Sequence, residues 1–354
     1  MKKLVIIQTT VPDYRKNFFD YLYESLPNKF VLYGGDEYFE TSTKSDENIR
    51  KNKVGNHFLF GRKFLFQTKI WHLLFKDIVL VLELNPRIIS NWIFLLIRYI
   101  LKKETVLWGH AWSRKGVNSK TDWLRNTMRR LSSRIIVYTN KQKEELQEKM
   151  PTKKIEAAPN AVLKSEEIKL FTHTNDINNL IYVGRLTKAK KPFYLVDFFY
   201  KNISILPKEV KLLLVGDGEE KEKIQKFVRE KKIEERVLIK GHISDYEQLK
   251  KMYSQSLFSV SPGYIGLSVT QSFGFGVPML VSENENHSPE IEAVIPNKNA
   301  LYYKTDDVVD FGKNLQQIFK DKEIWINKRA EIIQFCKEKY TVEAMGKTFV
   351  NLVK

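Results

Sequence analysis

Short apolar runs recur along the whole chain, and longer amphipathic segments separate them. In the first half these runs are Leu4–Ile7, Phe30–Tyr33, Ile78–Leu82, Thr105–Trp108, Arg134–Tyr138 and Ile155–Ala157. The pattern restarts with Leu180–Val183, Val210–Val215, Arg236–Lys240, Leu257–Val260 and Pro278–Val281. Apolar runs bounded by polar turns are typical of strands buried on both faces, and the segments between them have the length of helices. The alternation predicts an α/β protein with two doubly wound domains and parallel sheets.

A polar stretch, Lys164–Asn179, marks the passage between the two predicted domains. The chain has 354 residues and a mass of 41.7 kDa, which exceeds one ordinary hydrophobic core. We expect residues 1–165 to form the first Rossmann-like domain and residues 166–335 the second. Residues 336–354 are predicted to form a C-terminal helix that crosses back to the first domain. Ligands of such folds bind at the carboxyl ends of the strands, so the cleft between the two sheets is the expected site.

The most apolar stretch is Ile88–Leu101, and its continuous apolar part ends at Arg98. A bilayer requires about 20 apolar residues, so this stretch predicts a buried helix and not a membrane span. At the start of the chain only Leu4–Ile7 is continuously apolar, which predicts a first strand and not a signal peptide.

Composition adds information on surface and compartment. Hydrophobic residues make up 43% of the chain and charged residues 29%, mixed along its length, which is typical of a globular protein. Cys336 is the only cysteine, so no disulfide can form within the chain, and a reducing cytosol is expected. The net charge of +17 predicts a surface that prefers a polyanion or an anionic membrane.

Two basic segments lie in the first half, and each has two interpretations. Ser113–Arg134 carries seven Lys and Arg residues against one acidic residue, Asp122, and Phe58–Lys76 mixes lysine and arginine with aromatic residues. Such mixtures suit an anionic lipid surface, where aromatic rings enter the interface and cations meet headgroups. A core helix with a solvated basic rim is the interpretation favoured for either segment alone. Their occurrence in the same half favours membrane contact.

Ser261–Pro278 holds the clearest candidate for a phosphate site. It consists of a loop, Ser261–Gly266, after a predicted strand, and a helix that is predicted to begin near Leu267. The first N–H groups of a helix have no partner within the helix and lie at its positive dipole end. An anion can therefore bind there without a lysine.

Two further strand ends carry groups that can bind phosphate. Gly184 and Arg185 follow one strand, and Lys190 comes one turn later. Arginine offers a planar fork to a diphosphate and lysine a point charge. The alternative is that Lys188, Lys190 and Lys191 form a solvated loop. At the next strand end the sequence is Gly216-Asp217-Gly218, in which glycine lets the backbone approach a ligand, although such a turn is common.

His110 is the candidate among six histidines, because it lies beside a glycine just past a predicted strand. There it can donate a hydrogen bond or a proton into a cleft. We assign structural roles to the others, which are His57, His72, His173, His242 and His287. No cluster has metal-ligand spacing, and no Gly-x-Ser-x-Gly motif occurs, so neither a metal site nor a serine nucleophile is expected.

Several motifs occur together in a recognisable order. They are VPDYRKNFF, WGHAWSR, APNAV, GRLTKAK, the Gly216–Gly218 turn and PGYIGLSVTQSFGFGVP. In this order, over nearly the whole chain, they resemble the family 4 glycosyltransferases of the GT-B fold, and bacterial members that build surface polysaccharides in particular. The resemblance implies two Rossmann-like domains that face each other across a cleft.

The resemblance also implies residue roles. Arg185 and Lys190 would hold the donor diphosphate and neutralise the leaving nucleotide, and His110 would lie near the transferred sugar. The expected donor-binding residues are Gly184, Arg185, Lys190, Gly216, Asp217, Gly263, Gly266, Leu267, Ser268 and Gln271. Tyr14, Arg15 and His110 are expected on the acceptor side. Such enzymes usually retain the anomeric configuration and use no metal, so no cofactor is expected.

One departure from the family pattern concerns two glutamates that the family usually carries eight residues apart. The matching positions here are Gly263 and Gln271. A glutamine side chain can still donate to and accept from ribose hydroxyls, whereas Gly263 offers only its backbone. Glu290 or Glu292, in the following HSPEIEAV, is a candidate for the missing carboxylate. An inactive copy is the alternative, and the presence of Arg185, Lys190 and His110 favours an active enzyme.

The sequence thus predicts a glycosyltransferase that moves a sugar from a nucleotide-sugar donor to a lipid-linked glycan acceptor. We expect it in capsule, O-antigen, lipopolysaccharide or similar polysaccharide synthesis, in the bacterial cytoplasm, peripheral on the anionic inner face of the membrane. Its alternatives are a sugar-nucleotide epimerase of similar architecture and a catalytically inactive binding protein. A nucleic-acid partner is not expected. Only the positive net charge favours nucleic-acid binding, and the donor-site motifs would have no role in such binding.

Overall fold

The computed structural model describes residues 2–40, 44–113, 116, 119–170 and 177–354. The chain divides into two compact units, which are described separately. Unit 1 comprises Met1–Val162 and Val342–Lys354, and unit 2 comprises Leu163–Thr341. Arg114, Lys115 and His173, which the sequence analysis named or included, lie outside the described residues.

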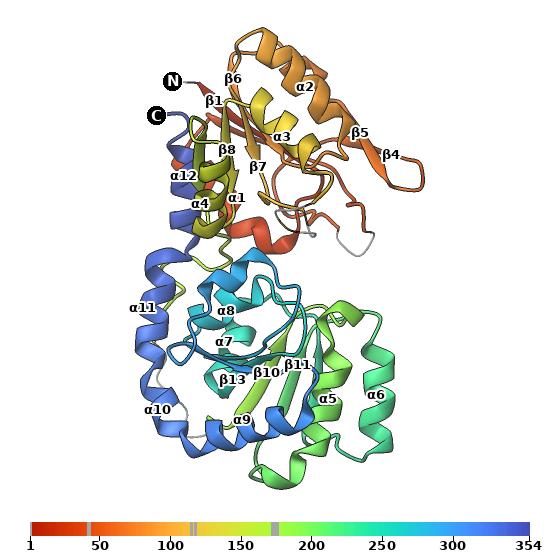
Figure 1. Cartoon of the computed structure of the whole chain (residues 1–354), viewed down its shortest axis with the longest axis vertical. Coiled ribbons are helices and arrows are strands. Elements are labelled where there is room, and N and C mark those ends of the chain that lie inside the picture. Colours follow the sequence, from red (N-terminus) through yellow and green to blue (C-terminus); the bar gives the residue numbers. More distant parts are fainter. Residues whose placement is uncertain (1, 41–43, 114–115, 117–118, 171–176) are drawn as a thin grey trace. The chain divides into compact units, whose positions relative to one another are not determined.

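Unit 1 is built on a parallel sheet of seven strands in the order β3-β2-β1-β6-β7-β8-β9 (Figure 1). Its strands are β1 (Lys3–Gln8), β2 (Phe30–Gly34), β3 (Asn52–Lys53), β6 (Ile78–Glu83), β7 (Thr105–Trp108), β8 (Arg134–Val137) and β9 (Lys154–Ala157). In the centre, Val5 pairs with Val31 on one side and with Leu80 on the other. The apolar runs predicted from the sequence form this sheet because helices cover both of its faces.

Alternate residues of each strand face opposite helical layers. On one face, Leu4, Ile6 and Val81 pack with α1 (Lys16–Ser25) and α12 (Val342–Val350). On the other face, Leu80 and Leu107 pack with residues of α2 (Ile89–Ile100) and α3 (Asp122–Leu131). α4 (Asn140–Lys149) covers β8 and β9 through Leu146. The segment predicted as one helix from residue 336 is thus two helices, α11 (Arg329–Lys339) in unit 2 and α12 in unit 1.

The segment Phe58–Lys76 contains no core helix, so that interpretation is wrong. It contains most of an antiparallel hairpin of β4 (Gly55–Leu59) and β5 (Phe64–Thr68), and then a short 3₁₀ helix, Trp71–Leu73. Residues alternate along β5, where Leu65 and Gln67 are buried and Phe64 is exposed. This period of two is the pattern of a half-buried strand, and the charged and aromatic composition obscured it.

The helix α2 is only half-buried, which corrects the prediction of a buried helix. Phe94 and Leu95 face the sheet and are fully buried, whereas Leu96, Tyr99 and Ile100 are exposed. Among the described residues, no helix combines the length and the hydropathy that crossing a membrane requires.

Unit 2 is built on a second parallel sheet, in the order β12-β11-β10-β13-β14-β15. Its strands are β10 (Asn179–Val183), β11 (Leu212–Val215), β12 (Val237–Gly241), β13 (Ser256–Ser261), β14 (Met279–Ser282) and β15 (Ala300–Tyr303). All were predicted except β15, which pairs with β14 at the sheet edge. Its run, ALYY, is as long as β11 and β14 but was not recognised as a strand.

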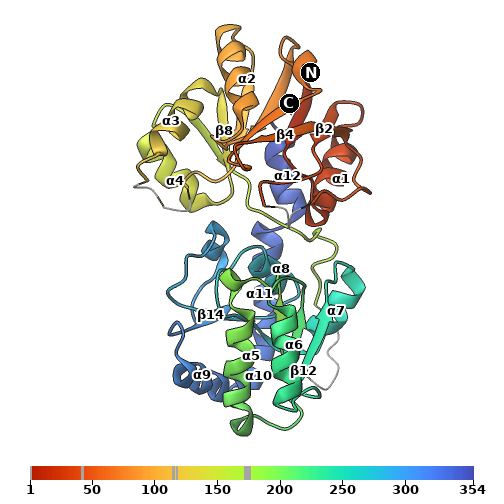
Figure 2. The ribbon, with the colours of Figure 1, turned by 90° about the vertical axis from the view of Figure 1, so that its right-hand side faces the viewer.

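Helices cover both faces of this sheet as well. The helices packed in its main core are α5 (Pro192–Lys201), α6 (Lys221–Glu230), α9 (Val308–Lys320) and α10 (Lys322–Asn327). Figure 2 shows α5 and α6 in front of the sheet and α11 behind it. α11 packs against the short helix α8 (Ser268–Gly274), and α7 (Tyr246–Ser254) packs against β13.

The strand order fixes where a ligand can bind in unit 2. β10 lies between β11 and β13, so the chain leaves β10 in one direction and later returns on its other side. At such a switch point the loops after neighbouring strands diverge and leave a crevice at the carboxyl edge of the sheet. The ends of β10, β11 and β13 therefore meet at one place, which we name the donor edge.

Candidate active site

The turns after β10 and β11 are held together at the donor edge by backbone hydrogen bonds. The N–H of Gly184 donates to the carbonyl of Val215 over 3.0 Å, and the N–H of Leu186 donates to that of Asp217 over 2.8 Å. Gly216 has φ of +149°, and a Cβ there would lie 1.9 Å from the Gly184 carbonyl oxygen. Only glycine fits this close approach. The packing of the two turns therefore explains the glycine at position 216, which the sequence alone did not.

Arg185 and Lys190 lie close enough to interact electrostatically at this edge. Lys190 is half-buried and donates through Nζ to the carbonyl of Tyr264 over 3.2 Å, with the ammonium 5.1 Å from the centre of that ring. Burial, followed by the nearby charge of Arg185, lowers the pKa of Lys190 to about 8. The structure thus brings together the two cations predicted to bind the diphosphate.

The solvated-loop alternative holds for Lys188 and not for Lys190 or Lys191. Lys188 is exposed. Lys191 forms ion pairs with Glu285 at 2.6 Å and Asp306 at 2.8 Å, which tie the turn to the loops after β14 and β15. Lys190 has a different environment because its ammonium is turned inward toward Tyr264.

The loop after β13 packs directly on the Lys190 turn. The N–H of Tyr264 donates to the Ala189 carbonyl over 3.0 Å. α8 begins at Ser268, as predicted, and has seven residues with no side chain capping its start. Gly266, Leu267, Ser268 and Gln271 are all half-exposed at this end. Their binding to donor phosphates or ribose stays a prediction.

Asp217 is used within its own turn. Its carboxylate accepts from the N–H of Gly218 over 2.8 Å and pairs with Lys221 at 2.5 Å. The hydrogen bond from Lys221 and that from the Gly218 N–H both lower the pKa of Asp217. A direct role in donor binding stays a prediction.

The 3₁₀ helix Pro289–Ala293 brings one of the two candidate carboxylates to the donor edge. Glu290 is buried, with 6% of its surface exposed, and the Ser288 hydroxyl donates to its carboxylate. Its negative charge counteracts the lowering of the Lys190 pKa. Glu292 is half-buried on the same 3₁₀ helix, and its charge acts on Tyr340.

His287 holds the same segment in place, in the structural role assigned to it. The N–H of Ile265 donates to its Nδ1 over 3.3 Å, and its Nε2 lies 2.9 Å from the Ser282 carbonyl. Burial lowers the pKa of His287, so the ring is neutral at pH 7. Its Nδ1 then accepts and its Nε2 donates, which satisfies both contacts.

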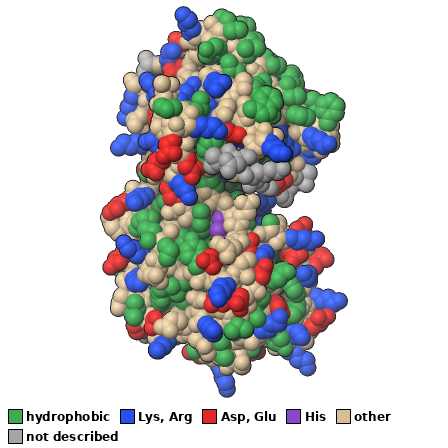
Figure 3. Space-filling model, viewed as in Figure 1, with side chains coloured by type: hydrophobic (Ala, Val, Ile, Leu, Met, Phe, Trp, Pro, Cys, Tyr) green, Lys and Arg blue, Asp and Glu red, His purple; other side chains and the backbone are tan. Residues whose placement is uncertain are grey.

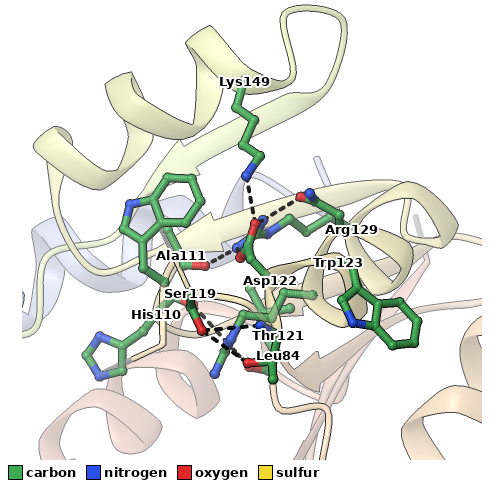
Figure 4. Close-up of polar contacts among 12 residues, drawn as sticks. Leu84, His110, Ala111, Ser119, Thr121, Asp122, Trp123, Arg129 and Lys149 are labelled. Atoms are coloured by element: carbon green, nitrogen blue, oxygen red, sulfur yellow. Dashed lines mark hydrogen bonds and ion pairs between the residues drawn. The ribbon is translucent and has the colours of Figure 1, made fainter. Parts of the chain in front are cut away.

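In unit 1, His110 follows β7 at the carboxyl edge of the sheet and is exposed. Its ring contacts Tyr138 edge to face, with the centres 4.6 Å apart. Arg125 on α3 donates to the carbonyls of His110 and Leu84 over 3.4 and 3.0 Å. Figure 4 labels Leu84 and His110, the two residues whose carbonyls accept from Arg125.

A buried ion cluster fixes the residues that follow His110. Arg129 is fully buried, donates to the Ala111 carbonyl and contacts both carboxylate oxygens of Asp122, at 3.3 and 3.2 Å (Figure 4). Lys149 on α4 pairs with the same carboxylate at 2.7 Å. One of the cations of Ser113–Arg134 that were predicted for a membrane surface, Arg129, is therefore buried and holds the His110 loop instead.

Two of the predicted acceptor-side residues, Arg15 and His110, contact one aromatic ring, that of Tyr138. Arg15 is buried, and its guanidinium lies 4.9 Å from the ring centre of Trp108 and 5.7 Å from that of Tyr138. Tyr14 is 43% exposed, with its ring centre 5.6 Å from the same guanidinium. Tyr138 thus contacts both Arg15 and His110. Tyr138 was not among the predicted site residues, although its place directly after a buried strand was a usable signal.

Glu83 is the second residue at this edge that the sequence analysis missed. It is the last residue of β6, and its carboxylate accepts from the N–H and from the hydroxyl of Thr9, the latter over 3.1 Å. Burial raises the pKa of Glu83, and the charge of Arg15 opposes that rise. A carboxylate that ends an otherwise apolar strand was the available signal.

Comparison with known proteins finds a family that matches the second half of the chain. Residues 164–339 match the model of the family described as "Glycosyl transferases group 1", and this range contains the whole donor edge. The chain is a glycosyltransferase of the GT-B fold. No curated protein matches it in sequence.

Solved structures cover both units of this glycosyltransferase. The structure of HepE from Anabaena in complex with UDP is one of them. Its alignment with this chain covers 100% of this chain and 99% of the HepE chain, with 13% identity and a TM-score of 0.70. A TarM variant from S. aureus, in complex with Fondaparinux, alpha-GlcNAc-glycerol and UDP, covers 99% of both chains, with 12% identity and a TM-score of 0.69. The lipopolysaccharide outer core galactosyltransferase WaaB covers 99% of both, with 16% identity and a TM-score of 0.66. These likenesses show the fold.

The predicted absence of metal concerns the same edge. In the part of this glycosyltransferase that the structure describes, no group of three or more His, Cys, Asp and Glu residues is arranged to hold a metal ion. Arg185 and Lys190 lie together at the donor edge, and their binding of a diphosphate stays a prediction. The prediction that the reaction uses no metal stays a prediction.

Proposed function

We propose that this glycosyltransferase takes a sugar from a nucleotide-sugar donor bound at the donor edge and transfers it to a glycan acceptor. The observation that carries the proposal is that two cations, Arg185 and the half-buried Lys190, lie close together where β10, β11 and β13 end. Its support from known proteins is that HepE has structures with UDP and UDP-glucose and that TarM has one with UDP.

The two cations give the donor edge its chemistry. In the transfer, the bond between the sugar carbon and the diphosphate oxygen breaks. The acceptor oxygen forms a bond to that carbon and passes its proton to the departing diphosphate. Negative charge grows on the departing diphosphate, and fixed positive charges stabilise it most in a partly buried site. In this proposal Arg185 and Lys190 supply that charge without a metal, and the sugar keeps its anomeric configuration.

On the acceptor side, we propose that His110, Tyr14 and Arg15 border the acceptor. The acceptor is a lipid-linked glycan, and the product belongs to a bacterial surface polysaccharide such as a capsule or O-antigen. This places the enzyme with the family 4 members it resembles. Support comes from WaaB, a lipopolysaccharide outer core galactosyltransferase of similar fold, and from the apolar surface of unit 1.

That surface, which we name the α2 surface, runs along α2 from the β4–β5 hairpin to the loop before β6. Its exposed apolar residues are Leu59, Phe60, Phe64, Phe75, Leu96, Tyr99, Ile100 and Leu101. Its exposed lysines are Lys63, Lys76 and Lys102. Figure 3 shows hydrophobic side chains gathered over α2 and the hairpin.

Hydrogen bonds hold both ends of the α2 surface together. Arg87, just before α2, donates to the carbonyls of Arg62 and Lys63 in the hairpin turn over 2.6 and 2.7 Å. Arg98, near the end of α2, is buried and donates to the Lys76 carbonyl over 3.1 Å, beside Phe75. Exposed apolar residues with lysines around them match an anionic bilayer. We therefore propose that the α2 surface binds the inner face of the membrane.

A thermal-shift panel tests the donor proposal. UDP, GDP, CMP, dTDP and their common sugar conjugates are added to the purified protein without metal. One nucleoside diphosphate and its conjugates are expected to raise Tm, because a ligand that binds only the native state stabilises it. No shift with any nucleotide, with or without added Mg²⁺ or Mn²⁺, would contradict the proposal. Isomerised sugar formed from the donor alone would indicate the epimerase instead.

A further inference from the structure

The donor edge has no room for a glutamate at the position where the resemblance expects one. A Cβ added at Gly263 would lie 2.8 Å from the Ala189 carbonyl oxygen and from the Lys190 carbonyl carbon, and 3.1 Å from Lys190 Cα. All three atoms are backbone, so a side chain at 263 would push the Lys190 turn away. Gly263 is therefore part of how the loop packs on that turn, and a carboxylate at this edge must come from another segment.

The 3₁₀ helix Pro289–Ala293 is fastened to the same loop on both sides of Ile265. The N–H of Ser288 donates to the Ile265 carbonyl over 3.0 Å, and the N–H of Ile265 donates to His287 Nδ1 over 3.3 Å. A Cβ at Gly266 would lie 3.8 Å from the Ser288 hydroxyl, so that hydroxyl faces the loop. This fastening fixes where Glu290 stands relative to the donor edge.

The Glu290 carboxylate is placed for a role at this edge. It is buried, accepts from the Ser288 hydroxyl, and interacts electrostatically with Lys190. A buried carboxylate is costly unless it is paired and hydrogen-bonded. Glu292 is more exposed, and its charge acts on Tyr340. Of the two carboxylates that the sequence offered, the fold brings Glu290 to the donor-edge cations.

We propose that Glu290 is a donor-binding residue, whose carboxylate accepts hydrogen bonds from hydroxyl groups of the donor sugar beside the diphosphate at Arg185 and Lys190. It takes the place of the glutamate that Gly263 excludes. An ionised carboxylate only accepts, and sugar hydroxyls donate, so the chemistry selects a hydroxylated sugar. The inference rests on the proposed function. It adds a specificity: a donor that lacks the bonded hydroxyl loses that hydrogen bond to the carboxylate and is transferred less efficiently.

The test compares Glu290→Gln with Glu292→Gln, a matched change on the same 3₁₀ helix. The nucleoside diphosphate identified by the thermal-shift panel and its sugar conjugate serve as ligands. Glu290→Gln is expected to lower kcat/KM for the nucleotide sugar by about 10- to 100-fold. Its Kd for the nucleoside diphosphate, which carries no sugar, is expected to stay within about threefold. Glu292→Gln is expected to change neither quantity.

A deoxy-sugar series provides a second readout. The wild type is expected to prefer the fully hydroxylated donor to the analogue lacking the bonded hydroxyl, and Glu290→Gln to lose most of that preference. A purely structural role would instead lower nucleoside diphosphate binding and sugar transfer together. That result, an unchanged kcat/KM, or an unchanged deoxy-sugar preference would overturn the inference.

Two outcomes separate this inference from the proposed function. A wild type that binds no nucleotide contradicts the proposed function itself. A wild type that binds and transfers, with Glu290→Gln unchanged, contradicts only the inference. If Glu290→Gln does not fold, Ser288→Ala removes the hydroxyl that orients the carboxylate. It is expected to weaken sugar transfer without weakening nucleoside diphosphate binding, and equal loss of both would overturn the inference.

Discussion

Lys190 shows how burial sets the working range of a donor-site cation. Its pKa is lowered to about 8, mainly by burial, so its ammonium carries a proton at pH 7 and loses it as the pH rises through about 8. A diphosphate is attracted by the protonated form. Donor binding should therefore be strongest below that range and weaken above it.

The first prediction follows from the lowered pKa of Lys190. In the wild type, Kd for the bound nucleoside diphosphate is expected to rise between pH 7 and pH 9, approaching about tenfold per unit at the alkaline end. Lys190→Arg should bind with little change over the same range, because a guanidinium stays protonated. Isothermal titration at several pH values measures both. An equal alkaline loss in Lys190→Arg would show that another group titrates.

His110 gives a second prediction at this scale. It lies in unit 1, and the donor edge lies in unit 2. His110→Ala is expected to lower kcat by about 10²- to 10⁴-fold, the usual contribution of a group that transfers or stabilises a proton. Nucleoside diphosphate binding should be unchanged. A variant with normal kcat would remove His110 from the chemistry.

At the scale of elements, the turns of the donor edge depend on glycine for two separable reasons. Gly216 combines φ of +149° with a close approach to the Gly184 carbonyl, whereas Gly61, in the β4–β5 turn, has φ of +61° and open space around it. A side chain at Gly61 meets only the conformational cost, roughly 1 kcal/mol. At Gly216 it also meets a backbone atom.

The third prediction compares these two sites. Gly216→Ala should abolish measurable nucleoside diphosphate binding or unfold unit 2, because the β10 and β11 turns must separate. Gly61→Ala should lower the free energy of unfolding by about 1 kcal/mol and leave binding unchanged. Chemical denaturation and titration of both variants check this. Full binding in Gly216→Ala would contradict the proposed packing of the donor edge.

The α3 cluster behind His110 provides the fourth prediction. Arg129→Met removes the buried guanidinium and leaves the Asp122 carboxylate in an apolar setting, with Lys149 as its remaining cation. Breaking a buried ion pair from one side costs about 3–5 kcal/mol. The unfolding transition of unit 1 should shift accordingly in urea. A loss under about 1 kcal/mol would show that the cluster is not needed to hold the His110 loop.

The elements also show what sequence patterning could predict. Strands buried on both faces, such as Leu4–Ile7 and Leu257–Val260, stood out as apolar runs, and from them the two sheets followed. The β4–β5 hairpin was missed because Phe64 and Phe66 are apolar on its outer side, which hides the alternation. Exposed aromatic residues break the usual rule of polar outside and apolar inside, and here they mark a candidate function.

For the molecule as a whole, site residues at strand ends were predictable and those set by tertiary packing were not. Arg185 and His110 were identifiable because each follows an apolar run. The closeness of Glu290 to Lys190, and of Tyr138 to Arg15, depends on how distant segments pack. The exclusion of a side chain at Gly263 is likewise visible only from the backbone that faces it.

The α2 surface carries the fifth prediction, which concerns the whole molecule. The protein is expected to sediment with vesicles that contain phosphatidylglycerol and much less with phosphatidylcholine alone. Phe60→Asp with Ile100→Asp, at positions 77% and 67% exposed, should reduce that binding at least tenfold. Val309→Asp, 62% exposed in unit 2, is the control and should bind normally. Equal binding by all variants would remove the α2 surface from the account.

The central claim is that Arg185 and Lys190 bind the diphosphate of a nucleotide-sugar donor. Isothermal titration of the identified nucleoside diphosphate into wild type, Arg185→Ala and Lys188→Ala tests it most directly, since Lys188 is an exposed cation in the same turn. The account predicts that Arg185→Ala weakens binding about 100-fold and that Lys188→Ala changes it less than threefold. Equal affinity in Arg185→Ala and the wild type would contradict it.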